Sequence, residues 1–307
     1  MPRLVFAGSS VGEPWSICGL VAARALAAYG YEVTVAHDSN SHRNIPYVAS
    51  RRAEVGATTP RHLAAARMHQ GDHAHDSVEE LAALAVIRRP QWLALAVRPD
   101  LGVADLREAG RRRLPLRIFS GTPAPGEDLD VVLRHHGFGL DEVVGWGGRH
   151  LRWHAQPRDL YVREGIVDVL LAWIYVGYTP TSHHWLEATV LKGFRFLDFE
   201  PALLDRLVEL GYGRGAIPEG LLPGVDRDIR SVVQDTIVIY GRRDLPDQVA
   251  ELVARALDER AELFTHARLP LYYERERVGR CDDLPIHPAA ERYYRAQGYL
   301  RDPAPGA

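Results

Sequence analysis

Two apolar stretches with the same pattern decide the fold class of this sequence. The first reads Leu93-Ala94-Leu95-Ala96-Val97-Arg98, and the second reads Thr236-Ile237-Val238-Ile239-Tyr240-Gly241-Arg242. Each predicts a buried strand that ends at an arginine and is followed by Asp-Leu and a helix. We interpret the pair as the two crossings between the lobes of a hinged α/β protein.

The segments around these stretches alternate between strand and helix patterns. Strands are expected at 4–7, 32–36, 55–57, 116–119 and 168–175, and helices at 18–29, 45–53, 128–135 and 248–257. Strands that alternate with helices along the chain are typical of parallel βαβ units. The sequence therefore predicts two α/β lobes, each with a mixed sheet that is flanked by helices.

Composition narrows the classes of function. The chain has 307 residues, of which 46% are hydrophobic and 25% are charged, as in a folded protein with a core. It carries 37 Lys and Arg residues against 40 Asp and Glu residues, a net charge of −3, so we expect no nucleic-acid partner. No stretch of 18 apolar residues occurs, and we expect no direct insertion into a membrane.

Two further features indicate neither a metal site nor a cofactor. Cys18 and Cys281 are too few for a zinc cluster or a disulfide framework, and we interpret them as isolated small hydrophobic residues. One group has a spacing that resembles metal ligands, but its polar surroundings favour a solvated loop: His69, Asp72, His73, His75 and Asp76.

The loop Gly8-Ser9-Ser10-Val11-Gly12 lies between the first expected strand and helix. Its Gly-x-Ser-x-Gly pattern matches the nucleophile elbow of serine hydrolases, which would make Ser10 a nucleophile. The elbow belongs on a central strand, however, and enters its helix directly. We therefore favour a loop whose backbone N–H groups bind an anion.

A second loop, Ser120-Gly121-Thr122, also joins a strand to a helix. The free N–H groups of that helix would favour a carboxylate or phosphate, although a plain loop with hydroxyl caps has the same pattern. Histidines follow two other strands: His37 and His42 after the second, and His183 beyond 177–180. They could bind an acid or transfer protons, or be exposed loop residues.

The ordered set of motifs resembles the TAXI family of solute-binding proteins, the extracytoplasmic receptors of TRAP transporters. The most specific stretch, 284–295, is similar to the family's ending "lHPGAerYYrE". The stretch 163–168 looks like its "lkdGkiDaf" step, Asn44 falls where its "GSxxN" ends, and Ser120 to Thr122 match its "GSGT" loop. The resemblance extends from Leu4 to Tyr299.

The resemblance implies a type II periplasmic-binding-protein fold, with a small organic acid bound in a cleft between two α/β lobes. We expect lobe I at 1–95 and 236–307 and lobe II at 96–235. Carried over by position, the resemblance and the loops above give these ligand-binding residues: Ser9, Ser10, Trp15, His42, Asn44, Ser120, Gly121, Thr122, Tyr175, Gly177, Tyr178 and Pro180.

The sequence departs from the family pattern in ways that bear on the ligand. Glu13-Pro14-Trp15 closes the first loop, and Glu13 adds a negative charge there. The segment after 168 is rich in aromatic residues, among them Trp173, Tyr175 and Trp185. We expect a ligand that has an aromatic or apolar part beside its acid group.

The N-terminus leaves two functions open. Met1-Pro2-Arg3 leads directly into the first expected strand. If Met1 is the native start, we expect a cytoplasmic protein; otherwise a signal sequence has been removed from a periplasmic or extracellular protein with membrane transporter subunits as partners. The alternative to a receptor is a cytoplasmic, cofactor-independent lyase or isomerase on the same fold, with His37, His42, His183 or Glu13 moving protons.

Overall fold

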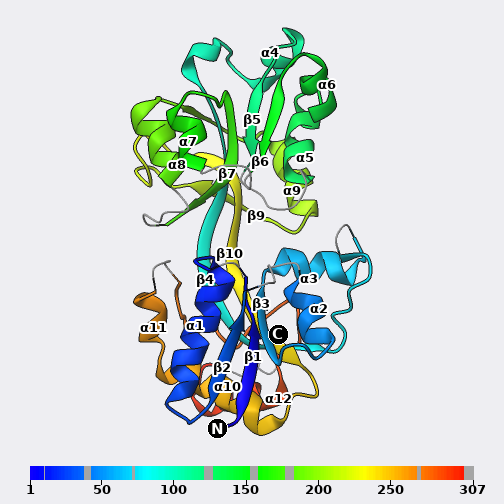
Figure 1. Cartoon of the computed structure of the whole chain (residues 1–307), viewed down its shortest axis with the longest axis vertical. Coiled ribbons are helices and arrows are strands. Elements are labelled where there is room, and N and C mark those ends of the chain that lie inside the picture. The colour runs from blue at the N-terminus through cyan, green and yellow to red at the C-terminus, as the bar shows by residue number, and fades with distance from the viewer. Residues whose placement is uncertain are drawn as a thin grey trace, which may run out of the picture. The chain divides into compact units, whose positions relative to one another are not determined.

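Two long strands organise the structure, β4 (Leu81–Val97) and β10 (Ile229–Arg242) (Figure 1). They contain the two apolar stretches that decide the fold class. The computed structural model describes residues 1–9, 11–37, 43–70, 73–120, 127–152, 158–176, 183–267 and 271–300. Within these ranges the chain forms two compact units. The boundary between them falls at Arg89–Pro90 in β4 and at Gln234–Asp235 in β10.

Unit 1 comprises Met1–Arg89 and Asp235–Ala307. Besides its parts of β4 and β10 it contains β1 (Arg3–Ala7), α1 (Pro14–Ala27), β2 (Glu32–Ala36), α2 (Asn44–Ala49), β3 (Val55–Thr58), α3 (Pro60–Arg67), α10 (Asp247–Glu259), α11 (Glu262–Thr265) and α12 (Pro288–Ala296). The strand order is β2-β1-β3-β10-β4. β1 is parallel to β2 and β3, whereas β10 is antiparallel to β3.

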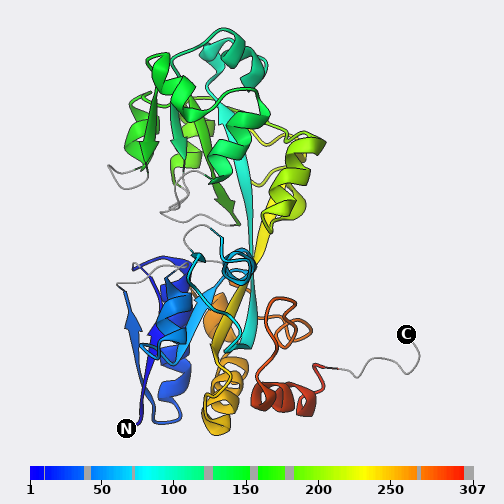
Figure 2. The same cartoon turned by 90° about the vertical axis from the view of Figure 1, so that its right-hand side faces the viewer.

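Helices cover both faces of this sheet because strand side chains alternate between them. Phe6 and Ile239 point to the face that packs against α1, α10 and α12, whereas Ala7 and Tyr240 point to the face of α2 and α3. Figure 2 shows α1 and α10 beside the strands of this unit.

Unit 2 comprises Pro90–Gln234. It contains parts of β4 and β10 with a 3₁₀ turn (Pro99–Leu101), α4 (Leu106–Arg111), β5 (Arg117–Ser120), α5 (Glu127–His135), α6 (Leu140–Gly145), β6 (Arg149–Arg152), α7 (Arg158–Arg163), β7 (Val169–Tyr175), α8 (His183–Leu186), a π-helical turn (Glu187–Leu191), β8 (Arg195–Leu197), α9 (Pro201–Glu209) and β9 (Gly213–Ile217). The strand order is β4-β7-β5-β6, with β8 beside β4 and β9 beside β10.

Two core clusters hold unit 2 together, one on each face of its sheet. Leu95 and Leu171 pack with α4, α5, α6 and α9, whereas Ala94 and Leu170 pack with α7 and α8. β5 is parallel to both β6 and β7, so the carboxyl ends of these three strands lie at one edge. The predicted βαβ organisation is present in both units.

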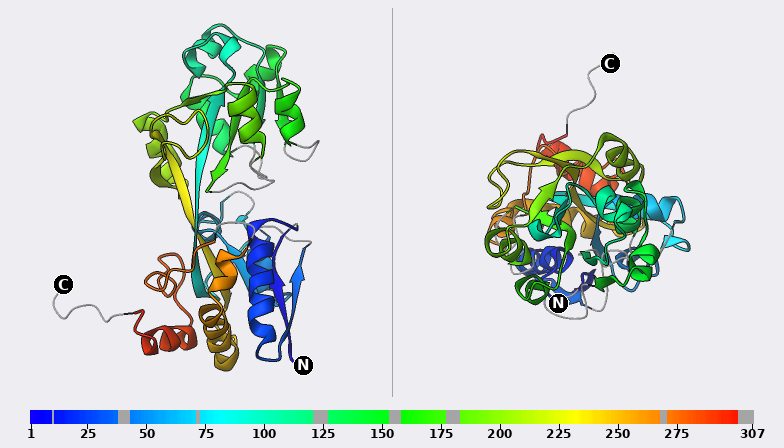
Figure 3. Two further views of the ribbon diagram at one scale, coloured as in Figure 1. Left: turned by 90° about the vertical axis from the view of Figure 1, so that its left-hand side faces the viewer. Right: turned by 90° about the horizontal axis from the view of Figure 1, so that it is seen from above.

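β4 is much longer than the strand expected at 93–98. Arg88, Arg89 and Pro90 interrupt the apolar pattern of the sequence, yet the strand continues through them and Arg89 is 5% exposed. Two polar residues beside it have partners: the buried Gln91 donates to Gln234 Oε1 at 2.6 Å, and the partly exposed Arg88 binds Glu274 at 3.0 Å. Figure 3 shows β4 and β10 as two strands shared by both units.

The expected lobes at 1–95 with 236–307 and at 96–235 stay a prediction, because lobes are defined by how they move. None of the helices in the described ranges combines the length and apolar character needed to span a bilayer.

Candidate functional site

The carboxyl ends of three parallel strands form one edge of the sheet in unit 1. Ala7 of β1 lies opposite Ala36 of β2 and Gly56 of β3. The residues that follow these strands therefore share this edge: Ser9 after β1, His37 after β2 and Thr59 after β3. Ligands of open α/β sheets bind outside the carboxyl ends of the strands.

Ser9, Ser16 and His37 are tied together at this edge. The Ser9 N–H donates to Ser16 Oγ at 2.9 Å, and Ser16 Oγ donates back to the Ser9 carbonyl. His37 Nδ1 lies 2.9 Å from the same carbonyl and 3.1 Å from Ser16 Oγ. Because a carbonyl can only accept, His37 carries a proton on Nδ1. Through these contacts, His37 Nδ1 links the loop after β1 to the first turn of α1.

Ser9 also has a buried hydroxyl whose hydrogen bonding bears on the site. The residue is 2% exposed, and its Oγ has no hydrogen-bond partner among the described residues. The bond to Ser16 holds Ser9 beside the first turn of α1, where Pro14 takes the first position. The N–H groups of a first helical turn have no carbonyl partner within the helix and favour an anion. This edge therefore combines a hydroxyl donor with backbone donors.

Glu13 and Trp15 flank the same helix start. Glu13 is the N-cap residue of α1 but its side chain makes no cap bond. Trp15 is partly buried and packs against the core of unit 1, so part of its ring serves the fold. The predicted ligand contact of Trp15 is not tested by this packing.

Asn44 has a structural bond at the start of α2. Its side chain is fully buried, and Nδ2 donates to the Ala57 carbonyl at 2.8 Å. The bond ties α2 to β3 next to the strand's carboxyl end. A role of Asn44 in ligand binding stays a prediction.

Ser120 lies at the corresponding edge of unit 2, at the carboxyl end of β5. Its Oγ is 2.7 Å from His150 Nε2, and the residue is 2% exposed. His150 is placed there because β6 pairs with β5 in register, with His150 opposite Ile118. Whichever atom donates, this bond fixes the rotation of the Ser120 hydroxyl.

Tyr175 and His183 lie on either side of the segment that follows β7. Tyr175 is the last residue of β7 and packs partly against a core cluster of unit 2. His183 begins α8, with its Nδ1 3.9 Å from Glu187 Oε1. Arg163 binds the same oxygen of Glu187 at 2.8 Å. His183 therefore stands beside an ion pair of unit 2.

Trp173 and Trp185, two of the aromatic residues from which we expected an aromatic or apolar part of the ligand, lie in the core of unit 2 instead. Trp173 is 9% exposed and packs on Tyr212, with ring centroids 5.4 Å apart. Trp185 is fully buried, stacks on Phe196 and donates its indole N–H to the Trp173 carbonyl at 3.0 Å. Both rings form the core of unit 2, since burying such large apolar surfaces stabilises the fold.

Seven predicted site residues lie outside the described residues, and their predictions remain as they were made. They are Ser10, His42, Gly121, Thr122, Gly177, Tyr178 and Pro180.

The expectation of a solvated loop is wrong for His73. This residue is 3% exposed, and its Nδ1 lies 2.6 Å from Asp76 Oδ2. The described residues contain no group of three or more potential ligands that could hold a metal ion. Both cysteines are free, and burial raises the pKa of Cys18 to about 12, which makes it a poor nucleophile.

Sequence reasoning missed three residues of these edges: Ser16, Thr59 and His150. Thr59 is the N-cap of α3 and accepts from the His62 N–H at 3.5 Å. The pair Thr59-Pro60 is a signal that could have been found, because proline favours the first helical position after a cap. Ser16 and His150 carry no local signal, since their partners come from other elements.

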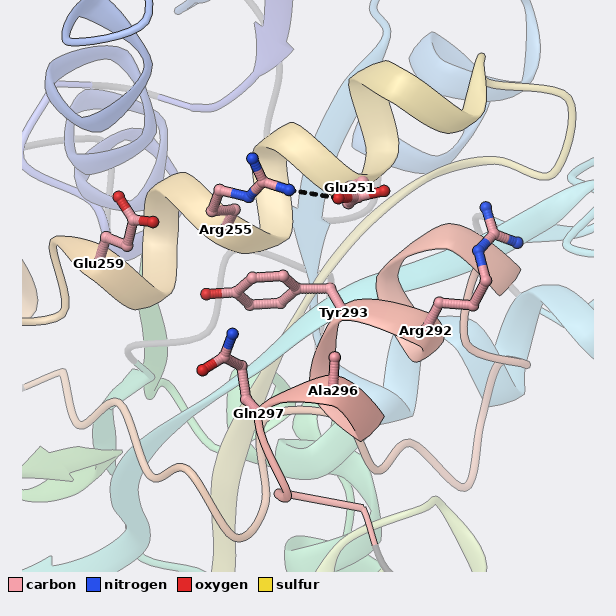
Figure 4. A pocket seen from close by; sticks show the side chains of 7 residues that line it. All are labelled: Glu251, Arg255, Glu259, Arg292, Tyr293, Ala296 and Gln297. Carbon is pink, nitrogen blue, oxygen red and sulfur yellow. Dashed lines mark hydrogen bonds and ion pairs between the residues drawn. The ribbon is translucent and has the colours of Figure 1, made fainter.

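A separate surface groove of about 440 Å³ lies between α10 and α12 of unit 1 (Figure 4). Its charged side chains have partners: Arg255 binds Glu251, Arg292 binds Asp247 at 2.6 Å, and Glu259 accepts from Tyr29. Because acids and bases neutralise one another here, the groove does not favour a charged ligand.

Comparison with known proteins identifies the fold. No family model matches the chain. MatC from Rhodopseudomonas palustris with bound malate is similar over 97% of this chain and 96% of that chain, at 12% identity and a TM-score of 0.51. A TctC solute-binding protein from Polaromonas, without ligand, is similar over 97% and 98%, also at 12% identity and 0.51. This chain has the two-lobed fold of periplasmic solute-binding proteins.

Proposed function

We propose that this protein is a solute-binding protein for a small organic acid, and that the edge at β1 and α1 takes a carboxylate of the ligand. The observation that carries the proposal is the buried Ser9 hydroxyl, which has no hydrogen-bond partner among the described residues and lies beside the first turn of α1. A carboxylate accepts hydrogen bonds and is attracted by a helix N-terminus, so it complements both features. Malate, bound to the structurally similar MatC, is an acid of this kind.

The finer parts of the proposal rest on the sequence resemblance. Assignment to the TAXI family, and transporter subunits as partners, are supported by the motifs around Asn44, Ser120 and 284–295. Ser120, whose hydroxyl bonds His150, stays a predicted ligand contact. The proposal that the ligand has an aromatic part now rests on Trp15 and Tyr175. The lyase or isomerase alternative and the enclosure of the ligand between lobes stay predictions.

Ser9→Ala tests the function through two effects of opposite sign. Removing a buried hydroxyl that has no partner among the described residues should raise the free energy of unfolding of the ligand-free protein by about 1 kcal/mol. The same change should weaken acid binding about tenfold, because it removes a hydrogen bond to a charged group. Thermal unfolding measures the first effect, and titration calorimetry with a panel of aliphatic, aromatic and amino acids measures the second.

Ser50→Ala is the matched control, since this serine of unit 1 is exposed and its hydroxyl bonds the Tyr47 carbonyl at 3.4 Å. It should change neither quantity. Acid binding that Ser9→Ala leaves intact would remove Ser9 from the site. Binding of none of the acids would contradict the proposed function.

A further inference from the structure

His37 carries one ring nitrogen that its bonds to the described part of the chain do not use. Both of its hydrogen bonds there run through Nδ1, which lies 2.9 Å from the Ser9 carbonyl and 3.1 Å from Ser16 Oγ. The residue is exposed. Nε2 therefore makes no hydrogen bond to the described residues.

The bonds of Nδ1 determine which nitrogen of His37 can gain a proton. A carbonyl oxygen can only accept, so Nδ1 carries a proton whether the imidazole is neutral or charged. The neutral ring has a single proton, and Nε2 is then an acceptor. A second proton binds to Nε2 and makes it a donor, while the bond from Nδ1 to Ser9 stays as it is.

His37 stands at the edge where we place the carboxylate of the ligand. It follows β2 directly, and it bonds the carbonyl of Ser9, the residue whose hydroxyl we assign to the ligand. Ser16, its second contact, lies in the first turn of α1. A carboxylate bound by the Ser9 hydroxyl and this turn is thus a neighbour of both residues that hold the His37 ring.

We infer that His37 is a ligand-binding residue, and that its Nε2 donates to the carboxylate of the acid from a charged imidazolium ring. This inference rests on the proposed function. A carboxylate can only accept, and so can Nε2 of the neutral ring, so the two form a hydrogen bond only after the ring gains a proton. Acid binding therefore takes up a proton, and the acid binds more tightly as the pH falls.

Other charged side chains lie near the same strand ends, and they must be told apart from His37. They are Glu13 before α1, Arg43 before α2, and Arg61 and His62 in the first turn of α3, whereas Asp38 and His42 lie outside the described residues. The two arginines keep their charge and take up no proton. Because Glu13 and His62 can change charge, the test needs a variant that removes Nε2 of His37 alone.

His37→Asn is such a variant, because it removes the second ring nitrogen and keeps a donor for the loop. The asparagine amide reaches about as far as Nδ1 of an imidazole and can donate to the Ser9 carbonyl in its place. A purely structural role of His37 would survive this change, whereas the proton uptake would be lost. His266→Asn is the control, since His266 is an exposed histidine elsewhere in unit 1.

Titration calorimetry with malate, or with the tightest acid of the panel, should be done at about pH 6 and about pH 8, a range in which imidazoles change charge. The wild-type protein should bind about tenfold tighter at the lower pH. His37→Asn should lose this difference and bind like the wild type at the higher pH, and His266→Asn should keep it. Buffers that differ in ionisation enthalpy report the proton uptake directly.

Nuclear magnetic resonance of the imidazole nitrogens locates the proton without a variant. Saturation with the acid at about pH 7 should protonate Nε2 of His37, which in the free protein near pH 8 should be protonated on Nδ1 alone. Acid binding that leaves Nε2 unprotonated, or a pH dependence that His37→Asn keeps, would overturn the role of His37 and leave the proposed function intact. Absence of binding by every acid of the panel would overturn both.

Discussion

Several residues of this protein are of a type that could bind a ligand or take part in catalysis, but their observed bonds stabilise the fold. Asp168, in a stretch that resembles a family motif, accepts from Arg117 Nε and NH2 at 2.8 and 2.7 Å, and lies 3.1 Å from Arg98. These bonds join the start of β7 to β4 and β5. The type of a residue indicates what it can bind, but its partners depend on contacts that are distant in sequence.

In the candidate site, too, some features could be predicted from the sequence and others could not. The loop after β1 could be predicted, because a Gly/Ser segment between a strand and a helix has a local pattern. The hydrogen bonds that join His62, His73 and Asp76 could not be predicted, because burial of His73 depends on how the turn after α3 packs. The spacing of these residues in the sequence fits an exposed loop equally well.

His136 predicts a pH dependence of stability. Burial is the main cause that lowers its pKa to about 4. The neighbouring His135 and Arg107 also lower this pKa, whereas Glu200 and Asp105 raise it. The unfolded chain binds this proton near pH 6.5, so folding is favoured above that pH. The free energy of unfolding should fall by up to about 3 kcal/mol as the pH drops from 6.5 to 4.

His136→Leu should remove this part of the pH dependence, which urea unfolding at a series of pH values would measure. The exposed His266 gives the control variant His266→Leu, whose curve should parallel the wild type. Parallel curves for His136→Leu and the wild type would show that His136 does not titrate in this way.

Elements could be predicted where local pattern and tertiary environment agree. β2 spans the predicted 32–36, and α5 differs from the predicted helix by one residue at its start. β4 could not be predicted in full, because Arg88 to Pro90 look like a break. Its polar residues are tolerated by partners on β10 and on the segment before α12, which no local pattern indicates.

The start of α12 explains the most specific stretch of the family resemblance. His287 is 1% exposed, its Nδ1 accepts from the Ala289 N–H at 3.2 Å, and its Nε2 donates to the Leu245 carbonyl at 3.1 Å. His287→Ala leaves both groups unpaired and should lower the free energy of unfolding by about 2–3 kcal/mol. His287→Asn keeps a cap oxygen and should cost about 1 kcal/mol.

Urea unfolding of these two variants shows directly whether His287→Ala loses more stability than His287→Asn. Equal stability of His287→Ala and the wild type would contradict a capping role for His287. A loss in His287→Asn as large as that in His287→Ala would show that the bond to Leu245, rather than the cap, carries the effect.

At the scale of the whole molecule, the repeated strand pattern correctly predicted two strands that belong to both units. The pattern is visible in the sequence because the parts of β4 and β10 that lie in the cores of the units are apolar. The ligand could not be predicted in the same way, since donors and acceptors at the strand ends come from separate elements. The fold itself is compatible with binding or with catalysis.

The most direct test of the central claim is the response of the backbone N–H groups of Trp15 and Ser16 to an acid ligand. Amide resonances of the protein would be followed by nuclear magnetic resonance while malate, or the tightest acid of the panel, is added. The account predicts that these two resonances shift in a saturable way, with the affinity that calorimetry gives, because the carboxylate binds at the start of α1. Saturable binding that leaves both resonances unmoved would contradict it.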